Sequence, residues 1–190
     1  MICMLLPTTP MAQERQLPTN SAQNEGPQFR PPRVQLPQNI QYSAWRKLCF
    51  EGSDGVTLCR TTSTGKEDTG QVVIRVDLIE RADGVERTGR AARLQLFVPQ
   101  GLNLAMGVKA TVDQGAPTRI PYSFCLTNIC IAADPASPRL IDEMETGQTL
   151  KIEQADFNSS TVAMNVPLNQ FAAAHQGPPA ETYDFGLDDD

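Results

Sequence analysis

The sequence is short of positive charge and of long apolar runs. Lys and Arg together number 16 against 22 Asp and Glu, so the formal net charge at pH 7 is −6. A nucleic-acid-binding surface needs a basic stripe to neutralise phosphates, and an anionic membrane attracts the same kind of surface. No apolar run reaches the roughly 20 residues that span a bilayer as a helix. We therefore expect no nucleic-acid partner, no docking on an anionic membrane and no membrane span.

Catalytic motifs are also missing. The single histidine, His175, lies at the end of a predicted helical turn, where an imidazole is more often solvated or compensates the helix dipole than acts as a base. No nucleophile elbow, dinucleotide-binding loop, calcium-binding loop or zinc-protease motif is present. The acidic residues Asp142, Glu143 and Glu145 crowd one short predicted helix and are interpreted as a solvated face. The sequence therefore predicts neither an enzyme nor a bound cofactor.

The 190 residues divide into four segments of different composition. Residues 1–12 begin with an apolar run and end with small residues, which resembles the back end of a secretory signal peptide. Residues 13–40 are rich in Gln, Pro and Asn and predict a flexible linker. Residues 41–176 carry the alternating pattern of a β domain. Residues 177–190 hold five acidic residues and predict a disordered acidic tail.

Within the third segment, short runs of β-branched and alternating residues are separated by turn residues, which is typical of strands. Strands are predicted at 42–50, 56–61, 71–79, 92–98, 107–113, 119–124, 148–154 and 161–166. The first two flank a turn at 52–55 and form a hairpin. Pro121 indicates a sheet edge or a bulge, because proline cannot donate to a strand ladder. Short helices are predicted after Ser137, which can cap with Pro138 at the first position, and over 168–174.

Four cysteines form two local pairs, Cys49 with Cys59 and Cys125 with Cys130, while Cys3 lies in the signal-like segment. Four cysteines allow three connectivities, of which local pairing is the simplest. Structural disulfides, which persist in oxidising compartments, are the favoured interpretation. A zinc site, a redox-active pair and buried free thiols stay open as alternatives. The spacing suits zinc poorly, and neither pair has the C-x-x-C pattern of redox motifs.

The lone tryptophan, Trp45, precedes Cys49 by four residues and is predicted to pack over the bridge of that cysteine. The strand count, the cysteine pairs and the minor helix content together predict an all-β fold. The expected architecture is a disulfide-stapled β-sandwich or partly open barrel with one or two short helices.

The cysteine blocks and the apolar motifs between them follow a characteristic order. They are Trp45, Cys49, Cys59, 101–102, 107–108, 112–113, 121–125, 130–132, 166–168 and 171–173. In combination they resemble the invasion-associated locus B family over residues 44–175. Ile129 departs from the pattern, because the family tends to carry glycine there. The resemblance implies a bacterial protein in the periplasm, secreted or attached to the envelope, with two disulfides, an all-β domain and no catalytic residues.

The favoured function is therefore a non-enzymatic, exported β domain that binds an envelope or host-surface protein. One alternative is a periplasmic protein that binds a small ligand in a cavity between sheets or in a barrel mouth. Another is a thiol–disulfide participant that uses Cys125 and Cys130. A contiguous exposed apolar patch favours a protein partner, and a deep apolar cavity favours a ligand.

Overall fold

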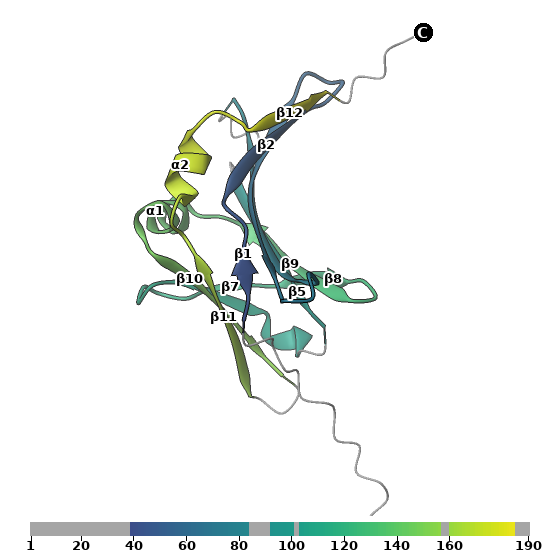
Figure 1. The fold of residues 1–190 in the computed structure, drawn as a ribbon, viewed down its shortest axis with the longest axis vertical. Helices are drawn as coiled ribbons and strands as arrows, with labels where there is room; N and C mark the ends of the chain where they lie inside the picture. The colour runs from purple at the N-terminus through teal and green to yellow at the C-terminus, as the bar shows by residue number, and fades with distance from the viewer. Residues whose placement is uncertain (1–38, 84–91, 101–102, 157–159, 185–190) are drawn as a thin grey trace, which may run out of the picture. The chain divides into compact units, whose positions relative to one another are not determined.

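The computed structural model describes residues 39–83, 92–100, 103–156 and 160–184. The segment predicted to be a signal-peptide remnant, 1–12, and nearly all of the predicted linker, 13–40, lie outside this part. The described residues form two β-sheets, two α-helices and one 3-10 turn, η1 (Leu104–Met106) (Figure 1). Among these residues, no helix has the length and apolar character that crossing a membrane takes.

The larger sheet has eight strands in the order β12–β2–β3–β4–β5–β9–β8, with β1 paired to β3. Its strands are β1 (Gln41–Tyr42), β2 (Arg46–Glu51), β3 (Thr57–Lys66), β4 (Val72–Arg81), β5 (Ala92–Pro99), β8 (Tyr122–Cys125), β9 (Ile129–Pro135) and β12 (Glu181–Asp184). All of its neighbours are antiparallel except β12 and β2, which are parallel.

The smaller sheet has four antiparallel strands in the order β11–β10–β6–β7. They are β6 (Val108–Val112), β7 (Thr118–Ile120), β10 (Thr149–Ala155) and β11 (Thr161–Pro167). The two sheets do not close into a barrel, so the fold is a β-sandwich, the first of the two predicted architectures.

One hydrophobic core lies between the sheets, and strand periodicity produces it. In β5, Leu94, Leu96 and Val98 are buried at alternate positions, because successive side chains of a strand point to opposite faces. Both sheets and both helices supply the largest fully buried side chains, which are Phe171, Ile74, Leu78, Leu94, Leu96, Ile120, Leu140, Met144, Leu150, Ile152 and Met164. The strands of the two sheets therefore depend on each other for burial.

Two helices cover part of this core. Helix α1 (Pro138–Thr146) begins as predicted, because the Ser137 side chain accepts a hydrogen bond from the Leu140 backbone N–H at 3.2 Å. It buries Leu140 and Met144 on one face. Helix α2 (Phe171–Gln176) follows β11 after three residues, and its Phe171 is fully buried.

The structure differs from the sequence expectations at three places. No strand is predicted over 129–135, yet β9 lies there, between β5 and β8. The single predicted strand 119–124 is divided at Pro121, so that β7 joins the smaller sheet and β8 the larger one. In the segment predicted to be a disordered tail, Glu181–Asp184 form β12, because their backbone pairs with the otherwise open edge of β2.

Candidate functional site

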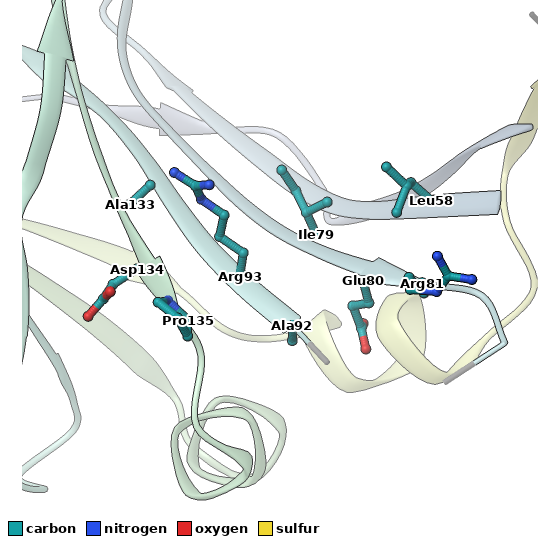
Figure 2. A pocket seen from close by; sticks show the side chains of 9 residues that line it. All are labelled: Leu58, Ile79, Glu80, Arg81, Ala92, Arg93, Ala133, Asp134 and Pro135. Carbon is teal, nitrogen blue, oxygen red and sulfur yellow. The ribbon is translucent and has the colours of Figure 1, made fainter. Parts of the chain in front are cut away.

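Two depressions adjoin on β4 of the larger sheet, where both are lined by Glu80 and Arg81. The first, seen in Figure 2, has a volume of about 360 Å³ and is lined further by Leu58, Ile79, Ala92, Arg93, Ala133, Asp134 and Pro135. The second has a volume of about 550 Å³ and is lined further by Lys47, Cys49, Glu51, Thr57, Cys59, Ala82, His175, Gln176, Pro179 and Thr182. Charged side chains are prominent in both, so neither is a deep apolar cavity of the kind expected for a carrier.

Strand register builds the first depression. Ile79 of β4 lies opposite Arg60 of β3 on one side and Arg93 of β5 on the other, and Arg81 lies opposite Leu58. Because side chains alternate along a strand, these residues share the face of the sheet that is opposite the core. In Figure 2, Leu58, Ile79 and Arg93 point to that side, whereas Glu80 points to the other side, toward the helices. We call this surface the arginine face.

A buried carboxylate anchors the arginine face. The Asp77 side chain is 1% exposed and accepts a hydrogen bond from the Thr62 hydroxyl at 2.6 Å and one from Arg75 Nε at 3.1 Å. A third group, Arg60 Nη1, lies 3.9 Å from Asp77 Oδ2. The Arg75 guanidinium also lies 3.5 Å from the centroid of the Phe97 ring. The arrangement fixes two guanidinium groups on the sheet surface while their carboxylate partner stays inaccessible.

His175 lines the second depression and contacts two carboxylates. Its Nδ1 lies 2.6 Å from Glu145 Oε1 of α1, and its Nε2 is hydrogen-bonded to Glu80 of β4. An ionised carboxylate only accepts, so these two contacts favour the imidazolium form of His175, which donates from both ring nitrogens. The hydrogen bond to Glu80 raises the pKa of His175 most, burial of the ring opposes that increase, and Glu145 adds to it. The ring also stacks on Phe171, with centroids 5.5 Å apart.

This cluster holds elements together and is not arranged as a metal centre. The two carboxylates meet opposite edges of one imidazole, so the three side chains do not converge on a common point. Within the described ranges, no group of three or more His, Cys, Asp or Glu residues is placed to hold a metal ion. Lys47 supports the same region, because its Nζ donates to the backbone oxygen of His175 at 2.7 Å.

The four cysteines of the β domain form two disulfides, Cys49–Cys59 and Cys125–Cys130. Each bridge joins residues that lie directly opposite each other in an antiparallel pair, β2 with β3 and β8 with β9. The first bridge is buried and lines the second depression. In the second bridge, Cys130 is buried and Cys125 is exposed.

Trp45 is buried, at 6% exposure, and its indole Nε1 donates to the Pro167 backbone oxygen at 2.8 Å. Its ring meets Phe171 edge to face, with centroids 4.9 Å apart. Both rings belong to the core cluster between the sheets, and the Cys49–Cys59 bridge lies outside that cluster. The sequence interpretation placed this ring over the bridge, whereas the structure places it against α2.

The Glu80–His175–Glu145 cluster is the feature that sequence reasoning missed. Glu145 was expected on a solvated helix face with its acidic neighbours, but its side chain is only 18% exposed and pairs with His175. His175 was expected to be solvated or to compensate the helix dipole, yet its side chain is 13% exposed. The three residues lie far apart in the sequence, and no local pattern connects them.

Comparison with known proteins gives consistent matches. The family model described as Invasion associated locus B (IalB) protein matches residues 45–179. Invasion protein B homologues from Brucella abortus strain 2308 and from Brucella abortus biovar 1 strain 9-941 are each 25% identical over 138 residues, which are 70% of this chain and 74% of each relative. The crystal structure of invasion associated protein B from Bartonella henselae matches with a TM-score of 0.59 at 21% identity, covering 73% of this chain and 92% of that one. At this level of identity, the match to the Bartonella henselae structure shows that the fold is shared.

Proposed function

The chain belongs to the invasion associated locus B family, and we propose that it works outside the cytoplasm as a non-enzymatic binding domain for an envelope or host-surface protein. The curated relatives are named as invasion protein homologues, which supports a role in contact with host cells or with the envelope.

Export is supported by the disulfides. Both bridges join strands within the larger sheet, and one of them is buried at the second depression. Disulfides of this structural kind persist in oxidising compartments and are rare in the cytosol of mesophiles. A periplasmic or secreted location is therefore the proposed one.

The arginine face is the observation that carries the binding role. Leu58 is 44% exposed there, Arg93 is exposed, and Phe124 at the far edge is 54% exposed. Arginine and aromatic side chains dominate the energetic centres of protein interfaces, because they combine charge or polarity with a large contact area. Asp77 holds Arg75 in position before any partner arrives, which lowers the entropic cost of binding.

Site-specific photo-crosslinking in living cells tests this proposal. A photoreactive amino acid is placed at Leu58 on the arginine face or at Lys109, an exposed residue of β6 on the smaller sheet, as the matched control. We expect a discrete covalent adduct with an envelope protein from position 58 only, and its loss when Arg93→Glu is added. Equal adducts from both positions, or none from position 58, would contradict a binding role for this face.

Fractionation tests the compartment separately. Osmotic shock should release the protein with periplasmic markers, or the culture medium should contain it, and alkylation without reductant should leave the four cysteines of the β domain unmodified. Free thiols in a cytosolic fraction would overturn the proposed location without bearing on the arginine face.

A further inference from the structure

We propose that the edge of β2 is an acceptor site for an acidic, extended segment of a partner protein, and that β12 is the occupant that this chain supplies to its own site. The site lies along β2, whereas the depression around Ile79 is lined by residues of β3, β4, β5 and β9. The two adjoin, because Leu58 of the arginine face lies opposite Phe50 of β2.

The attachment of β12 is the first observation. All four of its residues are exposed, so none contributes to the core. It pairs with β2 alone, in parallel, from Glu181 opposite Leu48 to Asp184 opposite Glu51. The ladder begins where the Ala180 backbone N–H donates to the Lys47 oxygen at 2.8 Å. A strand held on one side by main-chain hydrogen bonds is what a bound peptide forms on a sheet edge.

The chemistry of the occupant is the second observation. Tyr183 stacks on Phe50 of β2, with centroids 5.4 Å apart and planes 14° from parallel. The Tyr183 hydroxyl donates to the Glu181 carboxylate, and the positive charges of Arg46 and Arg60 act on the same hydroxyl. The Arg60 guanidinium in turn lies 5.3 Å from the centroid of the Phe50 ring. The edge thus fits an extended segment with an aromatic residue and neighbouring carboxylates.

The fold beneath β12 does not depend on it, which is the third observation. β2 is paired along its other side with β3, from Arg46 opposite Thr62 to Glu51 opposite Thr57, and the Cys49–Cys59 bridge joins the two strands. Lys47 Nζ holds the chain before β12 through the backbone oxygens of His175 and Gly177. An exchange of the strand would therefore leave the sheet, the bridge and α2 in place.

Two variants at one position of the full chain separate occupation of the edge from other effects. The Ala180 N–H faces β2, so by the two-residue period of a strand the Thr182 N–H faces β2 as well. Thr182→Pro removes a donor to the ladder and should detach β12. Thr182→Ala is the matched control, because it removes the same side chain and keeps the backbone N–H.

The probe is a fluorescent peptide that copies residues 178–190, and the readout is fluorescence anisotropy. We expect Thr182→Pro to bind it about tenfold more tightly than the wild-type chain or Thr182→Ala, because a tethered strand competes at roughly millimolar effective concentration. Adding Arg46→Glu to Thr182→Pro should weaken binding, as should a peptide with Asn and Gln in place of Asp and Glu. Trp45 fluorescence and circular dichroism establish that each variant is folded.

Three results would overturn the proposal. Equal binding by the wild-type chain and folded Thr182→Pro would place the peptide elsewhere, and no binding by folded Thr182→Pro would show that the edge accepts no free strand. A wild-type dimer that dissociates on Thr182→Pro substitution would make β12 of a second copy the occupant in place of a foreign segment. Arg93 lies on β5, three strands along the sheet from β2, so loss of the Leu58 adduct on Arg93→Glu substitution still tests the arginine face separately.

Discussion

At the scale of single residues, His175 links three parts of the described fold. One imidazole joins β4 through Glu80, α1 through Glu145 and the core through its stack on Phe171. It must remain protonated to serve both carboxylates, and loss of its proton would leave two carboxylates beside a neutral ring. The contacts made by this one side chain therefore depend on pH.

The titration of His175 can be measured without assignment, because the chain has a single histidine. We expect its pKa, followed by the imidazole proton resonances in NMR, to lie above the ordinary value of 6.5. Glu80→Gln should lower it, since the hydrogen bond to Glu80 is the largest cause of the increase. Glu153→Gln, which removes a carboxylate paired with Lys151 elsewhere, should leave it unchanged. A wild-type pKa at or below 6.5 would contradict the arrangement.

The raised pKa of His175 also predicts how the free energy of unfolding depends on pH. The folded state binds the proton more tightly than the unfolded state, so the stabilisation is fully present below about pH 6.5 and is lost as pH rises through the higher folded pKa. Urea unfolding of the wild-type chain from pH 6 to 9 should therefore show a falling free energy of unfolding. The fall should be smaller in His175→Gln. If the free energy of unfolding fell equally with pH in both proteins, His175 would not be the cause of the pH dependence.

Gly65 is a second residue whose identity is fixed by its surroundings. A Cβ at this position would lie 2.7 Å from Cγ2 of Ile40, 2.7 Å from Cγ2 of Ile74 and 2.8 Å from Cε1 of Tyr42. Gly65→Ala should destabilise the fold by about 1–3 kcal/mol, as overpacking does. Ser123→Ala, at an exposed position in β8, should change the free energy of unfolding by less than about 0.5 kcal/mol in the same urea titration. Equal costs for the two variants would contradict the crowding.

At the scale of elements, the sequence was informative where periodicity and caps were local. The strands over 92–98 and 148–154 and the helix after Ser137 were all predicted, because each pattern lies within ten residues. β9 was missed because its Ala132, Ala133 and Asp134 are poor strand formers, and only pairing with β5 and β8 makes it a strand. β12 was missed because backbone pairing with β2 holds it, without an apolar pattern.

The candidate site also has features that local sequence predicts and features that it does not. The cysteine pairs could be predicted because each is local, and the structure joins Cys49 with Cys59 and Cys125 with Cys130. The arginine face could not, because it arises from register among β3, β4 and β5. Pairing between strands is set by the tertiary fold, so no single segment of the sequence shows which residues will share the arginine face.

The β2–β3 bridge gives a prediction at this scale. Cys49→Ser combined with Cys59→Ser should lower the free energy of unfolding by about 2–3 kcal/mol, because the bridge closes a short loop in the unfolded chain. Differential scanning calorimetry in oxidising buffer measures the change. An unchanged melting temperature in the variant would show that the bridge contributes nothing.

At the scale of the whole described domain, both sheets bury side chains in one cluster. That cluster includes Leu94 and Leu96 from the larger sheet together with Leu150 and Ile152 from the smaller one. Neither sheet can lose its partner and keep its apolar face covered, so the two are expected to unfold together. The arginine face and the β2 edge both lie on the larger sheet, and both are therefore supported by residues of the smaller one.

A substitution that creates a cavity beneath the smaller sheet tests whether the two sheets unfold together. Ile152→Ala should destabilise the protein by about 2–5 kcal/mol. Trp45 lies in the core and donates to Pro167 of β11, so its fluorescence reports on the packing between the sheets, whereas far-ultraviolet circular dichroism reports on the strands of both. We expect the two midpoints to coincide in the wild-type protein and to shift together in the variant. Two separate midpoints would show that strands persist after the contact between the sheets is lost.

The passage of the chain from one sheet to the other at Pro121 has a mechanical consequence. β7 ends at Ile120 in one sheet and β8 begins at Tyr122 in the other, so one residue spans the passage between them. Its ring stiffens the backbone, and its carbonyl accepts a hydrogen bond from the Ala133 N–H of β9 at 3.1 Å. Tension applied to the β8–β9 hairpin therefore reaches β7 with no slack chain to absorb it. A load on β8 is therefore transmitted to β7 through this one residue.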